Sequence, residues 1–153
     1  MSLVGSPAPA FTLYDTAKKP VELASFAGKK VVLAFFPAAF TGVCTKEMCA
    51  FRDSIAQFND VGAAVLGVSV DAPFSNGAFA KENGVTFPLL SDYDRKATRA
   101  YGVAIENFAG LPGYVAANRA VFVIDENGQV TWEWKAPNPG VEPDYDAVRA
   151  AVS

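Results

Sequence analysis

The sequence contains no histidine and only two cysteines, Cys44 and Cys49. The lack of histidine excludes the catalytic pairs in which an imidazole activates a serine or a cysteine. A tetrahedral zinc site is not expected either, because two thiolates alone do not complete the metal shell. Two cysteines are also too few for the disulfide framework of a small secreted protein. The thiols are therefore either core residues or a redox pair, and we expect no metal and no other cofactor.

Long apolar runs and clusters of positive charge are missing as well. The longest apolar run, Val31 to Phe36, is far shorter than the roughly 20 residues that cross a bilayer. The first eleven residues show neither the basic flank nor the apolar stretch of a signal peptide. The chain has 13 Lys and Arg residues and 16 Asp and Glu residues, which gives a net charge of −3. The Lys and Arg residues do not cluster into a basic run. We expect a cytoplasmic, soluble protein that binds neither nucleic acid nor membrane.

The chain of 153 residues, 51% of them apolar, is long enough for one buried core. It contains no repeat and no linker, so we expect a single domain over residues 1–153. Apolar β-rich runs alternate with segments of helical period, which predicts an α/β three-layer sandwich with a central mixed β-sheet flanked by helices. The expected strands are 31–36, 63–70, 87–90, 120–125 and 130–134, and the expected helices are 46–58, 74–83, 93–101 and 145–152.

Two features indicate how the strands are arranged. The runs VVLAFF (31–36) and AAVLGVSV (63–70) are almost entirely apolar, as in central parallel strands covered on both faces. The runs AVFVID and VTWEW flank Asn127-Gly128, a dipeptide suited to the left-handed backbone of a hairpin turn. A parallel β-α-β unit, a hairpin and a final helix match a thioredoxin-like fold better than a Rossmann fold, because no glycine-rich fingerprint follows Phe36.

Cys44 is the best candidate for chemistry, because it follows an apolar strand at the predicted start of a helix. Unpaired N–H groups at a helix N-terminus favour a thiolate over a thiol. Full ionisation raises the reactive fraction of an ordinary thiol at most about thirtyfold at pH 7, so donors must also stabilise the transition state. Candidate donors are the Thr41 hydroxyl, the N–H groups of Val43 and Cys44, and one arginine. Thr41 also suits a helix N-cap, and Pro37 suits the end of a strand.

Cys49 follows Cys44 by five positions. On an undisturbed helix this spacing separates the Cα atoms by roughly 8–9 Å, whereas disulfides rarely tolerate more than about 7 Å. A bond between the two thiols would require unwinding of the first helical turns. The spacing also differs from the Cys-x-x-Cys motif of disulfide oxidoreductases, and Cys49 alone is equally explained as a small buried hydrophobic residue.

Several segments of the sequence resemble those of a known protein family. Pro37, Thr41 and Cys44 in PAAFTGVC, with Glu47 three residues on, resemble the peroxidatic signature of the peroxiredoxins, and GSPAPAFTL, VLGVSVD, FPLLSD and NRAVFVIDENGQV resemble other blocks of that family. The resemblance implies a thioredoxin-like fold in which Cys44 attacks a hydroperoxide and becomes a sulfenic acid, releasing water or an alcohol. Arg119 matches the arginine that binds the thiolate and peroxide, and Glu47 the residue that orients this arginine.

The same residues also have simpler interpretations. Arg119 could be a charge at a strand edge, and an acidic residue such as Glu47 is common in the first turn of a helix. The four other arginines are interpreted as solvated charges on helical segments: Arg52, Arg95, Arg99 and Arg149.

Cys49 matches the resolving cysteine of the bacterioferritin-comigratory-protein subgroup, which implies an intramolecular disulfide recycled by thioredoxin. Relatives with one cysteine share the Phe-Thr-Gly before Cys44, so a cycle with an external thiol is the alternative. A redox-sensing or thiol-exchanging domain and an inert domain with buried thiols are the other hypotheses. Hydrogen peroxide and organic hydroperoxides are the expected substrates. A homodimer is plausible from the family, with Phe40, Phe74 and Phe108 as the suggested apolar patch.

Overall fold

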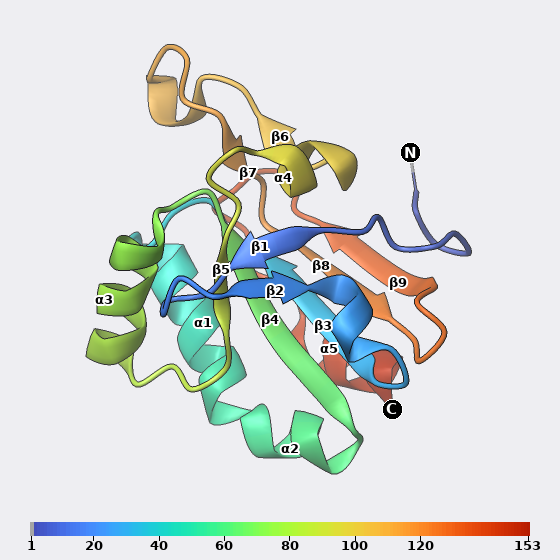
Figure 1. Ribbon diagram of the computed structural model, residues 1–153. Coiled ribbons are helices and arrows are strands. Elements are labelled where there is room, and N and C mark those ends of the chain that lie inside the picture. Colours follow the sequence, from blue (N-terminus) through green and yellow to red (C-terminus); the bar gives the residue numbers. More distant parts are fainter. Residues whose placement is uncertain (1) are drawn as a thin grey trace.

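The computed structural model describes residues 2–153 and is organised around a seven-stranded mixed sheet (Figure 1). The strands are β1 (Thr12–Tyr14), β2 (Pro20–Glu22), β3 (Lys30–Phe35), β4 (Ala63–Ser69), β5 (Leu89–Ser91), β6 (Ala104–Ile105), β7 (Ala116–Ala117), β8 (Ala120–Ile124) and β9 (Val130–Lys135). The helices are α1 (Gly42–Asp53), α2 (Ile55–Asp60), α3 (Pro73–Asn83), α4 (Lys96–Ala100) and α5 (Tyr145–Val152), with 3₁₀ turns η1 (Leu23–Phe26) and η2 (Phe108–Gly110). The sheet order is β2-β1-β5-β4-β3-β8-β9, and β6 pairs with β7 separately.

The two apolar runs form the centre of the sheet, as predicted. Strand β3 pairs with β4 in parallel, and with β8 in antiparallel orientation on its other side. Alternate residues of β3 contribute to different cores: Val32 belongs to one buried cluster, whereas Val31 and Leu33 belong to the other. Because both faces of these strands are covered, nearly every position along them is apolar.

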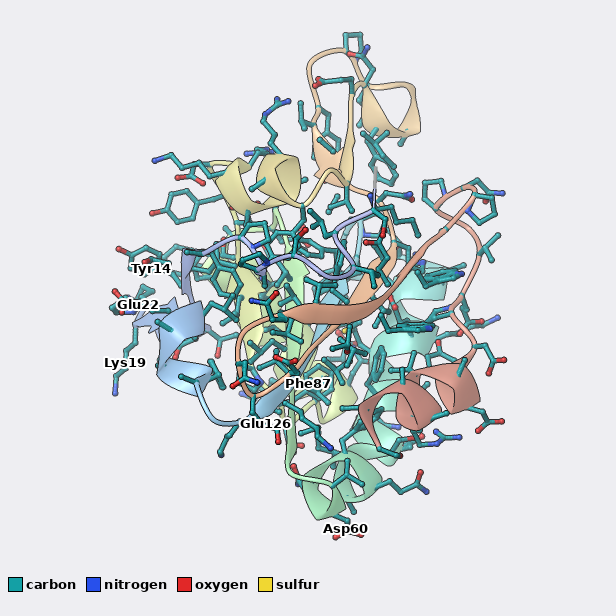
Figure 2. The ribbon with its side chains drawn as sticks, turned by 90° about the vertical axis from the view of Figure 1, so that its right-hand side faces the viewer. Tyr14, Lys19, Glu22, Asp60, Phe87 and Glu126 are labelled. Carbon is teal, nitrogen blue, oxygen red and sulfur yellow. The ribbon has the colours of Figure 1, made fainter. Side chains whose placement is uncertain are left out.

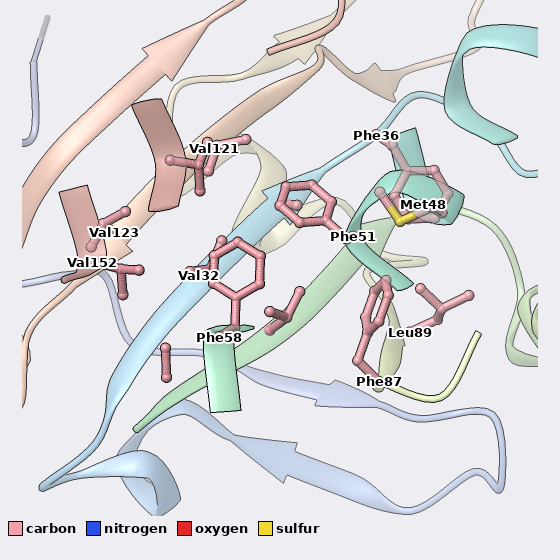
Figure 3. Packing of buried hydrophobic residues seen from close by; sticks show 14 of the residues in the cluster. Val32, Phe36, Met48, Phe51, Phe58, Phe87, Leu89, Val121, Val123 and Val152 are labelled. Atoms are coloured by element: carbon pink, nitrogen blue, oxygen red, sulfur yellow. The ribbon is translucent and has the colours of Figure 1, made fainter. Parts of the chain in front are cut away.

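Helices cover one face of the sheet, and the N-terminal segment with α4 covers the other. Side chains of α1, α2, α3 and α5 pack in the first cluster, where Met48, Phe51 and Phe58 meet residues of β3 and β8 (Figure 3). The second cluster includes Leu13 of β1 together with Ala97 of α4. These layers confirm the predicted three-layer α/β sandwich with a mixed sheet.

The predicted helix over 46–58 consists of two helices. Helix α1 begins earlier, at Gly42, and ends at Asp53. Ser54, with φ −101° and ψ 4°, leaves helical geometry before α2 starts at Ile55. The early start places Cys44 in the first turn of α1, as the sequence predicted.

The predicted helix over 93–101 is reduced to the short α4. The carboxylate of Asp92 accepts the N–H groups of Ala97 and Thr98 at 3.2 and 2.6 Å and thereby binds the start of this helix. Arg95 has a left-handed backbone with φ 64°, which ends the turn before α4.

The predicted hairpin joins β8 to β9, but its turn differs from the expected one. Gly128 adopts the left-handed conformation with φ 78°, whereas Asn127 is not among the residues with positive φ. The N–H of Gly128 bonds to the carbonyl of Asp125 at 3.0 Å, and the Asp125 carboxylate accepts the N–H groups of Asn127 and Gln129. Asp125 therefore closes a four-residue turn from its side chain.

The strand register determines which residues meet beside Cys44. Because β3 and β4 are parallel, their carboxyl ends lie at the same edge of the sheet. Strand β8 is antiparallel to β3 with Ala120 opposite Phe35, so β8 starts where β3 ends. The loop from β3 to α1, the segment after β4 and Arg119 therefore converge at one edge.

Candidate active site

Cys44 lies in the first turn of α1 and its side chain is fully buried. The polypeptide leaves β3 after Phe35 and enters α1 at Gly42 through a short loop, residues 36–41. The N–H groups of the first turn have no partners within the helix, so they add partial positive charge near the thiol. Because the Cys44 side chain is fully buried, negative charge that develops on its sulfur during a reaction must be stabilised by a donor from the protein rather than by water.

Arg119 provides this donor. Its Nη2 donates to the sulfur of Cys44 at 3.0 Å, and its Nη1 donates to Oε1 of Glu47 at 2.7 Å. Nε and Nη2 also donate to the carbonyl of Pro139 at 3.0 and 2.9 Å. The Arg119 side chain is only 2% exposed. The guanidinium is thus held by Glu47 and Pro139 while one nitrogen faces the thiol.

Burial alone would lower the pKa of Arg119, but Glu47 and Cys44 more than offset this effect, and the net result is a raised pKa. The guanidinium is therefore always charged at this site. A charged donor in a buried site has a much larger effect on an anion than the same donor in water.

Glu47 is one turn after Cys44 on α1, and its side chain is also fully buried. Burial raises the pKa of Glu47 to about 7, although the charge of Arg119 and the hydrogen bond to Arg119 both lower it. Within residues 2–153, Oε2 of Glu47 has no hydrogen-bond partner. The carboxyl group is therefore costly to ionise here, and Arg119 supplies the compensating charge.

Thr41 and Pro37 are both located in the loop before α1. The Thr41 hydroxyl donates to the carbonyl of Ala38 at 2.8 Å, and Thr41 occupies the N-cap position without a side-chain bond to the helix. Pro37 is buried and follows the last residues of β3. Both residues therefore lie in the segment that leads from β3 into the first turn of α1, and the Thr41 hydroxyl is bonded within this loop.

Cys49 is half-buried on the same helix as Cys44, and both thiols are free. Its sulfur lies 3.9 Å from Oδ1 of Asn83 at the end of α3. The guanidinium of Arg52 also donates to the Asn83 carbonyl. Because α1 runs without a break from Gly42 to Asp53, a Cys44–Cys49 bond requires the first turns of α1 to unwind.

Three of the four other arginines differ from the prediction that they are simply solvated charges. Arg52 donates to the Asn83 carbonyl, and Arg149 donates to the Ser54 hydroxyl at 3.3 Å. Arg95 is not on a helix and is not simply solvated: it precedes α4, and its Nε donates to the carbonyl of Val115 at 3.1 Å. The packing of the 93–95 turn against the segment before β8 explains the difference. Arg99 is exposed on α4 and pairs with Glu106.

Sequence reasoning missed two residues that support the site through Arg119 and through the loop before α1. Pro139 contributes a main-chain carbonyl, which no side-chain pattern can reveal. Asp71 accepts the N–H of Ala39 through Oδ2 at 2.8 Å and so contacts the loop between β3 and α1. A signal for Asp71 existed: a polar residue directly after a buried parallel strand lies at the edge where neighbouring strands also end.

The described residues offer no alternative metal centre. No group of three His, Cys, Asp or Glu residues within 2–153 is placed to share a metal ion. No helix in the same range is both long enough and apolar enough to cross a membrane.

The fold and the site define a thioredoxin-like α/β protein with a buried thiol in the first turn of a helix. A family model described as the AhpC/TSA family matches residues 4–133. Peroxiredoxin Q of Sedum lineare is 46% identical over 126 residues, which cover 82% of this chain and 65% of that protein. A putative peroxiredoxin of Mycobacterium tuberculosis is 41% identical over 126 residues and 80% of its length. The chain thus spans less than two thirds of the chloroplast protein of Sedum lineare.

Solved structures agree with this similarity. The peroxidoxin BcpB of Mycobacterium tuberculosis superposes with a TM-score of 0.87 at 30% identity, covering 99% of this chain and 97% of that chain. The bacterioferritin comigratory protein of Xanthomonas campestris, described for its alkyl peroxide reduction activity, gives a TM-score of 0.82 at 31% identity over 93% of this chain and 89% of that chain. The protein therefore belongs to the AhpC/TSA family and, within it, to the peroxiredoxins of the Q and bacterioferritin-comigratory type, as the sequence predicted.

Proposed function

We propose that the protein is a thiol peroxidase in which Cys44 reduces a hydroperoxide. The observation that carries this proposal is the 3.0 Å contact between Arg119 Nη2 and the Cys44 sulfur, with the guanidinium held from behind by Glu47. The thiolate attacks one peroxide oxygen and the O–O bond breaks. Cys44 becomes a sulfenic acid, and the other oxygen leaves with a proton as water or an alcohol. Arg119 and the N–H groups of the first turn stabilise the charge that develops on the oxygens.

We propose Cys49 as the thiol that resolves the sulfenic acid. Its sulfur displaces hydroxide from the Cys44 sulfenic acid, so that a disulfide forms and one water is released. A dithiol reductant of the thioredoxin type then reduces the disulfide to two thiols. The half-buried position of Cys49 on the same helix supports this step once the helix has unwound locally. The unbroken helix favours a second candidate, a one-cysteine cycle in which an external thiol reduces the sulfenic acid.

Hydrogen peroxide and small organic hydroperoxides are the proposed substrates. Phe40, 52% exposed next to the site, offers an apolar contact for an organic group, whereas Phe36 is fully buried. Phe40, Phe74 and Phe108 are the proposed dimer patch. Phe40 and Phe74 are 52% and 71% exposed, and Phe108 packs edge-on against Tyr114. Sedimentation would test the homodimer. The cytoplasmic location and the single domain over residues 1–153 stay predictions.

The test is the reaction of the reduced protein with one equivalent of hydrogen peroxide at pH 7, followed by rate and then by intact mass. Oxidation far faster than that of free cysteine, lost in Cys44→Ser, is expected. A mass lower by two hydrogens would assign the resolving role to Cys49, and a gain of one oxygen would indicate the one-cysteine cycle. A rate equal to that of free cysteine, or unchanged turnover in Cys44→Ser, would refute the peroxidase proposal.

A further inference from the structure

Asp71 connects the end of β4 to the loop that precedes the helix of Cys44. Its Oδ2 accepts the N–H of Ala39 at 2.8 Å, and Ala39 lies in the loop between β3 and α1. The acceptor is a carboxylate, and hydrogen bonds to an ionised group are stronger than neutral ones. The loop is thus attached at a defined point to a strand of the sheet.

Asp71 is itself fixed in place. The Ser69 hydroxyl donates to the same Oδ2 at 2.8 Å, and the Asp71 N–H bonds to the Ser69 oxygen at 3.2 Å. The Ser91 hydroxyl donates to the Asp71 carbonyl at 2.6 Å. Ser69 and Ser91 are at most 1% exposed, on the neighbouring strands β4 and β5. Asp71 is therefore held to the sheet and does not move with the loop. When the loop moves away, the hydrogen bond between Asp71 and Ala39 breaks.

The loop has a backbone geometry that must be held. Phe40 has φ 67°, a left-handed conformation that bulky residues rarely adopt. The Phe40 ring packs edge-on against the Phe79 ring, with 5.3 Å between the ring centroids, but Phe40 remains half exposed. The Thr41 hydroxyl bonds within the loop, to Ala38, and so does not attach the loop to the sheet. The contacts that oppose relaxation of this strain include Asp71–Ala39 and Phe40–Phe79.

The two proposed steps need different positions of this loop. Attack on peroxide needs Cys44 in the first turn of α1, next to Arg119. Disulfide formation with Cys49 needs that turn to unwind, because five positions on an intact helix separate the Cα atoms by roughly 8–9 Å. The loop immediately precedes this turn, so it must move when the turn unwinds.

We infer that Asp71 is a positioning residue that latches the β3–α1 loop and thereby sets the balance between peroxide reduction and disulfide formation. The kinetic part of this inference rests on the proposed function. The latched state presents Cys44 to Arg119 and the peroxide. The unlatched state lets Cys44 approach Cys49.

The primary test is amide hydrogen exchange of reduced protein, which needs neither peroxide nor a resolving thiol. Asp71→Ala should raise the exchange of amides 39–45 about tenfold, since the bond to the carboxylate is lost. Amides of β8 should not change. Asp71→Asn keeps an oxygen that can accept from Ala39, so its effect should lie between those of wild type and Asp71→Ala. Asp60→Asn is the matched control, because Asp60 is exposed at the end of α2, at the bottom of the molecule in Figure 2.

Kinetics provide the second readout. Asp71→Ala should slow oxidation by peroxide and accelerate the conversion of sulfenic acid to disulfide, each severalfold, and Asp71→Asn should partly restore both. Unchanged exchange of amides 39–45 in both Asp71 variants would overturn the inference, as would both rates falling together. If Asp71→Ala does not fold, Asp71→Asn carries the same test. Slow oxidation of the wild type would refute the proposed function instead. The hydrogen exchange of amides 39–45 would still show whether Asp71 holds the β3–α1 loop in place.

Discussion

Arg119 and Cys44 are 75 positions apart in the sequence, yet Nη2 of the arginine lies 3.0 Å from the cysteine sulfur. The pairing of Phe35 with Ala120 brings them together, because it places the start of β8 beside the end of β3. Pro139 and Glu47 hold the remaining guanidinium nitrogens. The donor is therefore oriented before a substrate arrives, which is the condition for efficient electrostatic stabilisation of a transition state.

We predict that Arg119→Lys slows oxidation of Cys44 by hydrogen peroxide about 10- to 100-fold, as expected for a lost hydrogen bond to a charged group. Lysine keeps the positive charge but not the planar fork that contacts Cys44, Glu47 and Pro139 together. Stopped-flow measurement of the second-order rate constant checks this result. Arg99→Lys, an exposed arginine paired with Glu106, is the matched control and should leave the rate unchanged. Equal rates for wild type and Arg119→Lys would show that charge alone is sufficient.

Cys49→Ser is predicted to separate the two possible cycles. If Cys49 resolves the sulfenic acid, the variant treated with one equivalent of peroxide gains one oxygen instead of losing two hydrogens. Its oxidation should be as fast as that of the wild type, because Cys49 does not contact the Cys44 sulfur. Thioredoxin-driven turnover should fall at least tenfold, since no disulfide is available to the reductant. Turnover at the wild-type level would instead support the one-cysteine cycle.

Glu47 should make the folded state less stable as the pH rises from about 4.5 to about 7. Its pKa is about 7 in the folded protein against an ordinary value of 4.5. Between these values the folded state binds more protons than the unfolded state, so the free energy of unfolding falls with pH, by at most about 1.4 kcal/mol per pH unit for this group. Glu47→Gln cannot titrate and should flatten this dependence.

Urea unfolding at pH 5, 6 and 7 measures the effect of Glu47 on stability. Glu82→Gln, on the exposed side of α3, is the control and should keep the wild-type slope. Asp92 also has a pKa raised by burial, so the wild-type curve contains its contribution too. Only the difference between the two variants isolates Glu47. Identical slopes in Glu47→Gln and wild type would mean that Glu47 stays ionised across this range.

The sequence was sufficient for those parts of the fold that follow from local patterns. The central strands β3 and β4 and the β8–β9 hairpin were predicted because apolar periodicity and turn residues mark them. The short strands β1, β2, β6 and β7 were missed, because two or three residues are too few to show a period; β5 is equally short, but the apolar residues at 87–90 mark it. The 93–101 segment was predicted too long, because the carboxylate of Asp92 forms a turn that the helical pattern does not reveal.

The candidate site divides in the same way. Cys44, Glu47 and Thr41 lie on one continuous segment, so their spacing could be interpreted directly. The assignment of Arg119 required the resemblance to a family, because its contact with Cys44 depends on strand register. Pro139 acts through its main chain, and Asp71 acts on the backbone of Ala39. Such contacts depend on tertiary packing and have no sequence pattern of their own.

Gly67→Ala should destabilise the protein, because the side chains of Leu89 and Met48 pack closely against this glycine. A Cβ at Gly67 would lie 2.6 Å from Cδ2 of Leu89 and 3.3 Å from Sδ of Met48. Figure 3 shows Met48 and Leu89 in the crowded cluster beside α1. Overpacking of this kind costs typically 1–3 kcal/mol. Because Met48 is on the same helix as Cys44, peroxide reactivity should fall as well.

Gly77→Ala is the matched control for this substitution. Gly77 is inside α3, and its Cβ would meet the Thr16 Cβ at an ordinary 3.6 Å. Alanine in a helix interior is more favourable than glycine by about 1 kcal/mol, so this variant should be slightly more stable than wild type. Urea denaturation of both variants, with the midpoint concentrations compared at constant m, shows whether each substitution lowers or raises the stability. A Gly67→Ala protein as stable as Gly77→Ala would show that Leu89 and Met48 can move aside, and that the close packing under α1 is not required for the fold.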